Sequence, residues 1–143
     1  MYKRRHMMAD IENSVTPWPE ETMKNYLWLD EYLQKQPATV KEFQPAWQAY
    51  KYLLGGKMYA YIGINEQNGR PIITLKLEPM YSDMLRKQYD NIVPGYYMNK
   101  VHWSTVYLDS EIPHEVLADM VRASHKLVFS LLSKKIQRDI LGE

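Results

Sequence analysis

The sequence predicts one α+β domain in which an antiparallel sheet carries helices packed on one face. Helical periods over residues 20–35 and from Pro113 onward flank a central region whose apolar residues alternate with a period of two. Within that region the pair Asn68-Gly69 is a strong hairpin signal, so the strands on either side of it should pair antiparallel. We expect residues 1–8 to be a tail or extension and residues 9–143 to form the single domain.

The totals are those of an ordinary water-soluble domain. A chain of 143 residues can bury roughly two-thirds of its unfolded surface. The absence of cysteine removes disulfides, thiolate metal sites and cysteine nucleophiles together. No run approaches the ~18 apolar residues that a membrane span needs, and the N-terminus has no apolar signal core. We therefore expect a cytoplasmic protein with no membrane partner.

The net charge of +1 is unevenly distributed. Residues 1–8 carry +3, residues 9–42 carry seven acids against three bases, and residues 43–143 carry twelve bases against ten acids. The larger part of the chain is thus mildly basic. This balance is compatible with a local phosphate-binding patch and does not require one.

The first helix is predicted from its flanking prolines. Pro17-Trp18-Pro19 blocks a helix before residue 19 and suits the first turn of one after it. Glu20 and Glu21 favour the positive end of the helix dipole. Apolar residues at helical spacing then continue to a stop before Pro37, which gives a helix over residues 20–35.

The sheet is predicted from alternation and turn residues. The expected strands cover residues 40–43, 47–54, 57–64, 72–77 and 103–108. Turns are expected at residues 44–46, 55–56, 68–69 and 94–95. Along residues 57–64, one face should carry Met58, Ala60, Ile62 and Ile64. The other face should carry Tyr59, Tyr61 and Gly63.

Two further helices are predicted from proline starts. One begins at Pro79 and runs for about eleven residues, with Met80, Met84 and Leu85 facing inward. The other begins at Pro113 and runs for about twenty residues. Its buried face should comprise Leu117, Met120, Val121, Ser124, Val128, Leu131 and Leu132. Basic residues toward its end suit the helix dipole and could form a basic rim, namely Lys126, Lys134, Lys135 and Arg138.

No catalytic, metal or cofactor signature is found. Gly55-Gly56-Lys57 is followed by Met58 and a strand, whereas a phosphate loop needs Ser or Thr and then a helix. The four histidines lack zinc-like spacing. Ser124 and His125 are neighbours on a helix and point about 100° apart, which prevents a nucleophile–base pair. Asp109 and Glu111 are interpreted as turn and cap residues. The sequence therefore predicts no enzyme and no cofactor.

Aromatic residues are the most unusual feature, with twelve Tyr and four Trp against two Phe. Most of these rings are expected to line the sheet, buried, with their hydroxyls at water. Some could instead lie on an exposed face beside lysines, where rings stack on bases and cations hold phosphates. The candidates for that surface are Lys57, Tyr59, Tyr61, Lys76, Tyr96, Lys100, His102 and Trp103.

Four short motifs carry a family resemblance. They are Gly56-Lys57-Met58-Tyr59-Ala60, Leu75-Lys76-Leu77-Glu78-Pro79, Pro94-Gly95-Tyr96-Tyr97-Met98-Asn99-Lys100 with His102-Trp103, and Leu108-Asp109. In this order, from about residue 40 to 133, the chain resembles the MmcQ/YjbR family of small bacterial proteins. The resemblance implies a compact "double wing" α+β domain, and members are commonly labelled DNA-binding by fold analogy. Tyr97 and His125 depart from the family pattern, where histidine and tyrosine are usual.

Three hypotheses for function follow. The first is a nucleic-acid (DNA)-binding surface of Lys57, Lys76, Arg86, Tyr96, Asn99, Lys100, His102 and Trp103. In this first hypothesis the lysines and Arg86 contact phosphates. Tyr96 or Trp103 stacks on or wedges between nucleotide bases, and Asn99 and His102 donate hydrogen bonds. The second is a module that binds another protein or a small ligand. The third makes the stretch from Met98 to Trp103 purely structural. The oligomeric state is left open.

Overall fold

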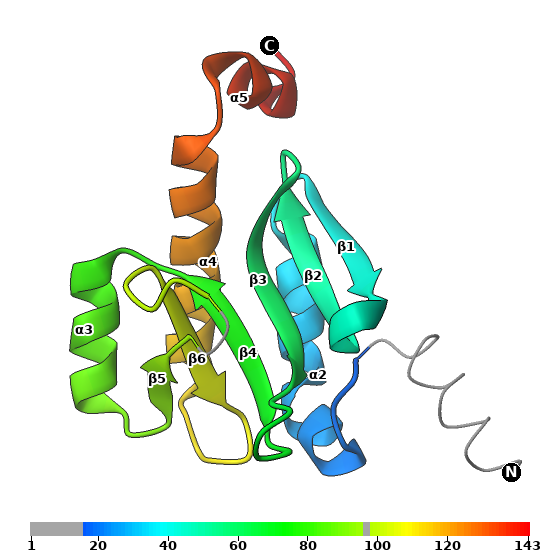
Figure 1. The fold of residues 1–143 in the computed structure, drawn as a ribbon. Coiled ribbons are helices and arrows are strands. Elements are labelled where there is room, and N and C mark those ends of the chain that lie inside the picture. The colour runs from blue at the N-terminus through cyan, green and yellow to red at the C-terminus, as the bar shows by residue number, and fades with distance from the viewer. Residues whose placement is uncertain (1–15, 96–97) are drawn as a thin grey trace, which may run out of the picture.

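The computed structural model describes residues 16–95 and 98–143 (Figure 1). Its elements are α2 (Glu20–Lys35), β1 (Thr39–Gln44), the 3-10 turn η1 (Pro45–Trp47), β2 (Ala49–Leu54), β3 (Lys57–Ile64), β4 (Pro71–Lys76), α3 (Pro79–Gln88), β5 (Ile92–Pro94), β6 (Trp103–Tyr107), α4 (His114–Leu131) and α5 (Lys134–Leu141). Among these described residues, no helix is both long and apolar enough to cross a bilayer.

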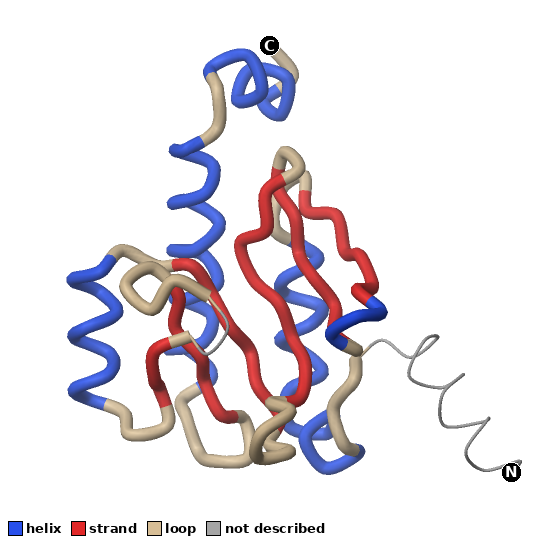
Figure 2. The backbone as a smooth tube through the Cα atoms, in the orientation of Figure 1, coloured by secondary structure: helices blue, strands red, loops and turns tan. Residues whose placement is uncertain are grey.

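One six-stranded antiparallel sheet organises the domain, in the order β1-β2-β3-β4-β6-β5. Helices α2 and α4 lie behind the sheet, and α3 lies beside its β5 edge (Figures 1 and 2). The other face, which we call the open face, carries no α-helix among the described residues. The predicted α+β class is confirmed.

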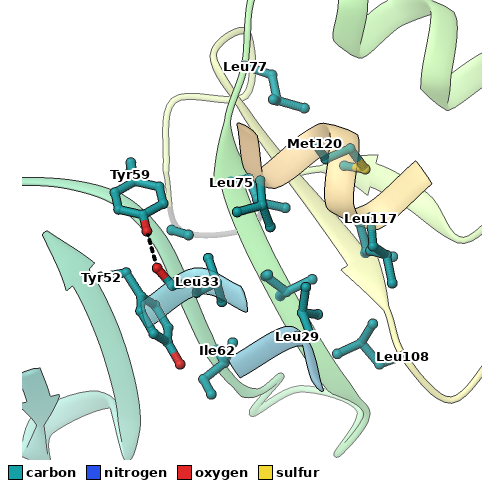
Figure 3. Close-up of a cluster of buried hydrophobic side chains, with 14 of the residues drawn as sticks. Leu29, Leu33, Tyr52, Tyr59, Ile62, Leu75, Leu77, Leu108, Leu117 and Met120 are labelled. Carbon is teal, nitrogen blue, oxygen red and sulfur yellow. Dashed lines mark hydrogen bonds between the residues drawn. The ribbon is translucent and has the colours of Figure 1, made fainter. Parts of the chain in front are cut away.

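The core lies between the sheet and the helices α2 and α4. Leu29 and Leu33 of α2 meet Leu117 and Met120 of α4, and all four side chains are fully buried (Figure 3). Burial of each such side chain stabilises the fold by about 1.5–3 kcal/mol before entropy. Helix α2 has the predicted bounds, and its first turn carries the expected pair of acids.

A β-bulge changes the predicted alternation of β3. In the register with β2, Tyr52 pairs with Ala60 and Leu53 pairs with Met58, so Tyr59 is an extra residue. Tyr59 therefore joins Ala60 on the helix side, and Met58 turns to the open face. The predicted faces are right from Ala60 onward and wrong for Met58 and Tyr59. An inserted residue reverses the face of every side chain that precedes it in the strand.

Two strand predictions need correction. Trp47 belongs to η1 and not to β2, because Gln48 takes a left-handed φ of 49° that ends the turn before the strand begins. The strand β5 was not predicted at all. Three residues are too few for an alternation signal, and β5 exists through its pairing with β6.

Helix α3 presents a different face from the one predicted. Met80 and Met84 are 86% and 53% exposed, so their predicted inward positions are wrong. Leu85 does face inward, and with it Ser82, whose hydroxyl accepts a hydrogen bond from Ser104 Oγ at 3.2 Å. Helix α3 thus contacts β6 through a small polar residue, and not through the two methionines that were predicted to face inward.

The C-terminal part forms two helices instead of one. Leu132 leaves the helical conformation, and Ser133 caps α5 by accepting a hydrogen bond from the Ile136 amide. Leu131, predicted to be buried, is 62% exposed at this break. Helix α5 lies against the β2–β3 hairpin, since a Cβ added at Gly55 would lie 2.9 Å from Leu132 and 3.0 Å from Ile136.

Candidate nucleic-acid interface

The antiparallel topology brings Lys76 and the segment 98–102 to one end of the sheet. Lys76 is the last residue of β4 and pairs in register with Trp103, the first residue of β6. The next amide, that of Leu77, donates a hydrogen bond to the carbonyl of His102 at 2.8 Å. The segment that carries Lys100 and His102 is therefore joined by its backbone to the end of β4.

Lys76 and Lys100 keep their charges unpaired among the described residues. Lys100 is exposed and Lys76 is half-buried. The ion pairs found there use other bases, namely Lys41, Lys51, Arg70 and Arg122. We call Lys76 and Lys100 the basic end of the sheet. One exposed carboxylate, that of Glu78, follows Lys76 by two residues.

Lys57 lies at the same end of the sheet but on its other face. Lys57 pairs with Leu54, whose side chain belongs to the core on the helix side, so Lys57 is on that side too. Lys76 is two residues after Thr74 and four after Ile72 in β4, and therefore shares the open face with Ile72. Two residues before Lys57, Gly55 of the same hairpin lies against Ile136 of α5, a helix that carries the exposed bases Lys134, Lys135 and Arg138. The structure thus brings Lys76 and Lys100 together and separates Lys57 from them.

Arg86 holds the segment in place from α3. Its Nε donates to Ser104 Oγ at 3.2 Å, and its Nη2 donates to the carbonyls of Lys100 and Trp103 at 2.9 and 3.0 Å and to Ser104 Oγ at 2.9 Å. Hydrogen bonds from a charged donor are worth about 1.5–3 kcal/mol. This geometry assigns Arg86 to positioning Lys100, in place of the phosphate contact that the sequence suggested.

Asn99 shapes the turn before β6. Its Oδ1 accepts a hydrogen bond from the Val101 amide at 2.9 Å, and its carbonyl accepts from the amides of His102 and Trp103 at 3.2 and 2.9 Å. A side chain that bonds its own backbone two residues on is a standard turn device. The structural hypothesis therefore describes Asn99 well, while the side chains of Lys100 and His102 stay exposed.

Trp103 is buried and cannot stack on a nucleotide base. Its side chain is 8% exposed, and the Gly95 amide donates to its carbonyl at 2.8 Å. A Cβ at Gly95 would lie 2.8 Å from the Trp103 Cβ, so only glycine allows this approach. The stacking role predicted for Trp103 is wrong for this reason. Tyr96, the other candidate for stacking, lies outside the described residues.

Two tyrosines considered for the surface are also buried. Tyr59 is fully buried and donates to the Leu33 carbonyl at 2.9 Å, and burial raises its pKa to about 12 (Figure 3). The ring of His125 meets that of Tyr59 edge-on at 5.4 Å. Tyr61 is 6% exposed on the open face. For these two rings the buried interpretation is the right one.

A hollow of about 810 Å³ lies at the opposite end of the molecule, where α2 and α4 begin. Asp109 on its rim is already bound, because Arg70 donates to both carboxylate oxygens at 2.8 to 3.1 Å. These hydrogen bonds lower the pKa of Asp109 below its usual value. Asp109 is thus a turn residue, as its sequence context indicated.

Relatives of known sequence share most of the domain. The uncharacterized protein YjbR of Escherichia coli K12 is 30% identical over 105 residues, which cover 73% of this chain and 87% of that protein. The uncharacterized protein YbdF of Escherichia coli O157:H7 is 37% identical over 98 residues, which cover 68% of this chain and 77% of that protein. These names state no activity.

Solved structures share the fold. A crystal structure of protein DR2400 from Deinococcus radiodurans has a TM-score of 0.68 at 28% identity and covers 78% of this chain and 84% of its own. A crystal structure of a Pseudomonas syringae protein has a TM-score of 0.59 at 28% identity, over 71% of this chain and 96% of its own. The sequence profile named YjbR matches residues 33–127. With the motifs and the fold in agreement, the chain belongs to the YjbR family.

Proposed function

We propose that this protein is a non-enzymatic, cytoplasmic domain that binds DNA weakly, mainly through the phosphate backbone. The observation that carries the proposal is the basic end of the sheet: Lys76 and Lys100 lie on joined segments and have no carboxylate partner among the described residues. Contacts from lysine to phosphate supply affinity and orientation without reading sequence.

The supporting contacts make this end rigid. Arg86 and Asn99 both hold the peptide group between Lys100 and Val101, so the Lys100 side chain extends from a held segment. The exposed His102 adds a hydrogen-bond donor beside it. Because Trp103 is buried, we expect little discrimination between base sequences. Two lysines that each neutralise one phosphate give a slope of log K against log salt of about −1.8.

The test is fluorescence anisotropy with a labelled DNA duplex and a single strand of equal length, at several salt concentrations. Lys76→Ala and Lys100→Ala should each flatten the salt slope by about one unit. Lys24→Ala, an exposed lysine on α2, is the matched control and should leave the slope unchanged. Glu78→Gln should strengthen binding, since it removes a negative charge beside Lys76.

Lys57→Ala decides how far the interface extends. A flatter slope would mean that DNA crosses the end of the sheet and reaches the α5 side, and an unchanged slope would confine it to the open-face side. The proposal fails if no binding is detected at low salt. It also fails if Lys24→Ala weakens binding as much as Lys76→Ala and Lys100→Ala do.

A further inference from the structure

The open face contains a second hollow, whose lining includes neither lysine of the basic end. Its volume is about 290 Å³, and Gly63 near the end of β3 forms part of its floor. Ile72 in its lining lies four residues before Lys76 along β4, which corresponds to roughly 13 Å. Met98, also in its lining, lies two residues before Lys100. The hollow thus borders the proposed DNA interface and contains neither Lys76 nor Lys100.

The hollow exists because two neighbouring floor positions carry almost no side chain. Ala49 of β2 is buried beside Gly63, and a Cβ added at Gly63 would lie 3.1 Å from the Ala49 Cβ. Longer side chains stand around this floor, among them those of Ile72 and Met98. The sequence thus leaves a depression in an otherwise filled sheet surface.

One wall is an exposed tryptophan on a well-held turn. Trp47 is 41% exposed, and its ring lies 5.5 Å from that of Tyr61 at an angle of 54°. Gln44 accepts a hydrogen bond from the Ala46 amide, and Gln48 donates to the Pro45 carbonyl at 2.9 Å, which together fix the turn. The partly exposed ring of Trp47 is therefore held at a defined position beside the buried ring of Tyr61.

The charge at the rim is negative. Glu66 borders the hollow, no Lys or Arg lines it among the described residues, and Glu66 forms no ion pair within them. Its hairpin is rigid, because the Asn65 carbonyl accepts from the Gly69 amide at 2.7 Å and the Asn65 side chain donates to Tyr107 at 3.1 Å. A carboxylate beside Trp and Tyr rings attracts cations and repels phosphates.

We propose that this hollow binds a small organic cation with an apolar or aromatic body. The ammonium group lies near Glu66 and the rings of Trp47 and Tyr61, and the body covers the floor over Ala49 and Gly63. The volume is near the lower end of the roughly 300–1,000 Å³ usual for ligand sites, which suits a molecule of one ring. The two proposals rest on different residues, so either can fail alone.

The test uses the full-length chain and three probes of similar size: 2-phenylethylamine, 2-phenylethanol and phenylacetate. Titration is followed by 1H–15N NMR, with the Trp47 indole and the Gly63 amide as reporters. We expect saturable shifts at both reporters and affinities in the order amine, alcohol, acid. Glu66→Gln should weaken amine binding by up to about fivefold, because it removes an exposed ion pair with the ammonium group, and should leave the alcohol unchanged. Glu31→Gln, an exposed carboxylate on α2, is the matched control and should change neither.

Trp47→Ala separates the ring contribution from the charge. It should weaken both the amine and the alcohol, and because Trp47 is on the surface, the amide spectrum away from the hollow should stay unchanged. The proposal is overturned if phenylacetate binds as well as the amine, if the shifts map elsewhere on the protein, or if Glu66→Gln leaves amine binding unchanged. Failure of all three probes to saturate the reporters overturns it as well.

Discussion

Replacement of Tyr59 by phenylalanine tests the account of the core. The Tyr59 hydroxyl is buried, donates to the Leu33 carbonyl at 2.9 Å and lies 2.9 Å from Thr39 Oγ1. Burial raises its pKa from 10.0 to about 12, because a phenolate would lose its hydration there. The folded protein therefore holds this group in its protonated form.

The magnitude follows from linkage. A pKa raised on folding contributes stability that is complete below pH 10 and is lost as the pH rises through 12. The shift of about two units corresponds to about 2.7 kcal/mol. At pH 7, Tyr59→Phe should lower the free energy of unfolding by about 1–3 kcal/mol, since it removes the hydrogen bonds of the hydroxyl to the Leu33 carbonyl and to Thr39. Between pH 10 and 12 that deficit should shrink by about 2–3 kcal/mol.

Urea denaturation of both proteins at several pH values from 7 to 12 measures the deficit. The other titratable groups, including Tyr52, whose pKa is raised by burial, are present in both proteins, so most of their contribution cancels in the difference between the two unfolding free energies. A deficit that stays constant with pH would refute the reasoning. The hydroxyl would then titrate alike in the folded and unfolded states.

Three further substitutions probe other contacts. Asp30 is 1% exposed, lies 2.7 Å from Lys41 Nζ and accepts a hydrogen bond from a buried tyrosine, so Asp30→Ala should lower the unfolding free energy by about 3–5 kcal/mol in urea titrations. Gly95→Ala should cost about 1–3 kcal/mol in the same assay, because its Cβ would lie 2.8 Å from that of Trp103; an unchanged midpoint would mean that this approach is not rigid. Arg86→Met should accelerate amide hydrogen exchange across residues 99–103, and exchange at the wild-type rate would rule out its positioning role.

Local chemistry made the first helix and the central hairpin predictable. Pro19 and Pro37 bracket α2, and Asn68-Gly69 joins the two strands next to it, so neighbouring residues alone decide these elements. Long-range packing decides the features that were missed. The bulge at Tyr59 leaves the local pattern strand-like, and Met84 is about as apolar as Leu85, which α3 buries in its place. The face on which Tyr59 lies depends on the pairing of β3 with β2, and the face that α3 buries depends on how the helix packs against the sheet.

The candidate site was predictable in its residue types and not in its roles. A run of Asn, Lys, His and Trp after a Pro-Gly pair indicates a special loop. It does not show that Trp103 is turned inward while the Lys100 side chain stays outside. The partner that fastens the loop, Arg86, comes from a helix fourteen residues earlier in the chain than Lys100. Contacts of this kind, between segments that are separate in the sequence, depend on the tertiary structure.

The bulge in β3 has a consequence for comparing members of this family. The inserted residue lies between the hairpin and the rest of β3. It therefore determines on which face of the sheet the Lys57 side chain lies. A homologue that lacks the inserted residue and otherwise keeps the sequence of β3 would present its hairpin lysine on the open face, the face of Lys76. Sequence alignments that place a gap between residues 57 and 60 would thus group proteins with different charge surfaces.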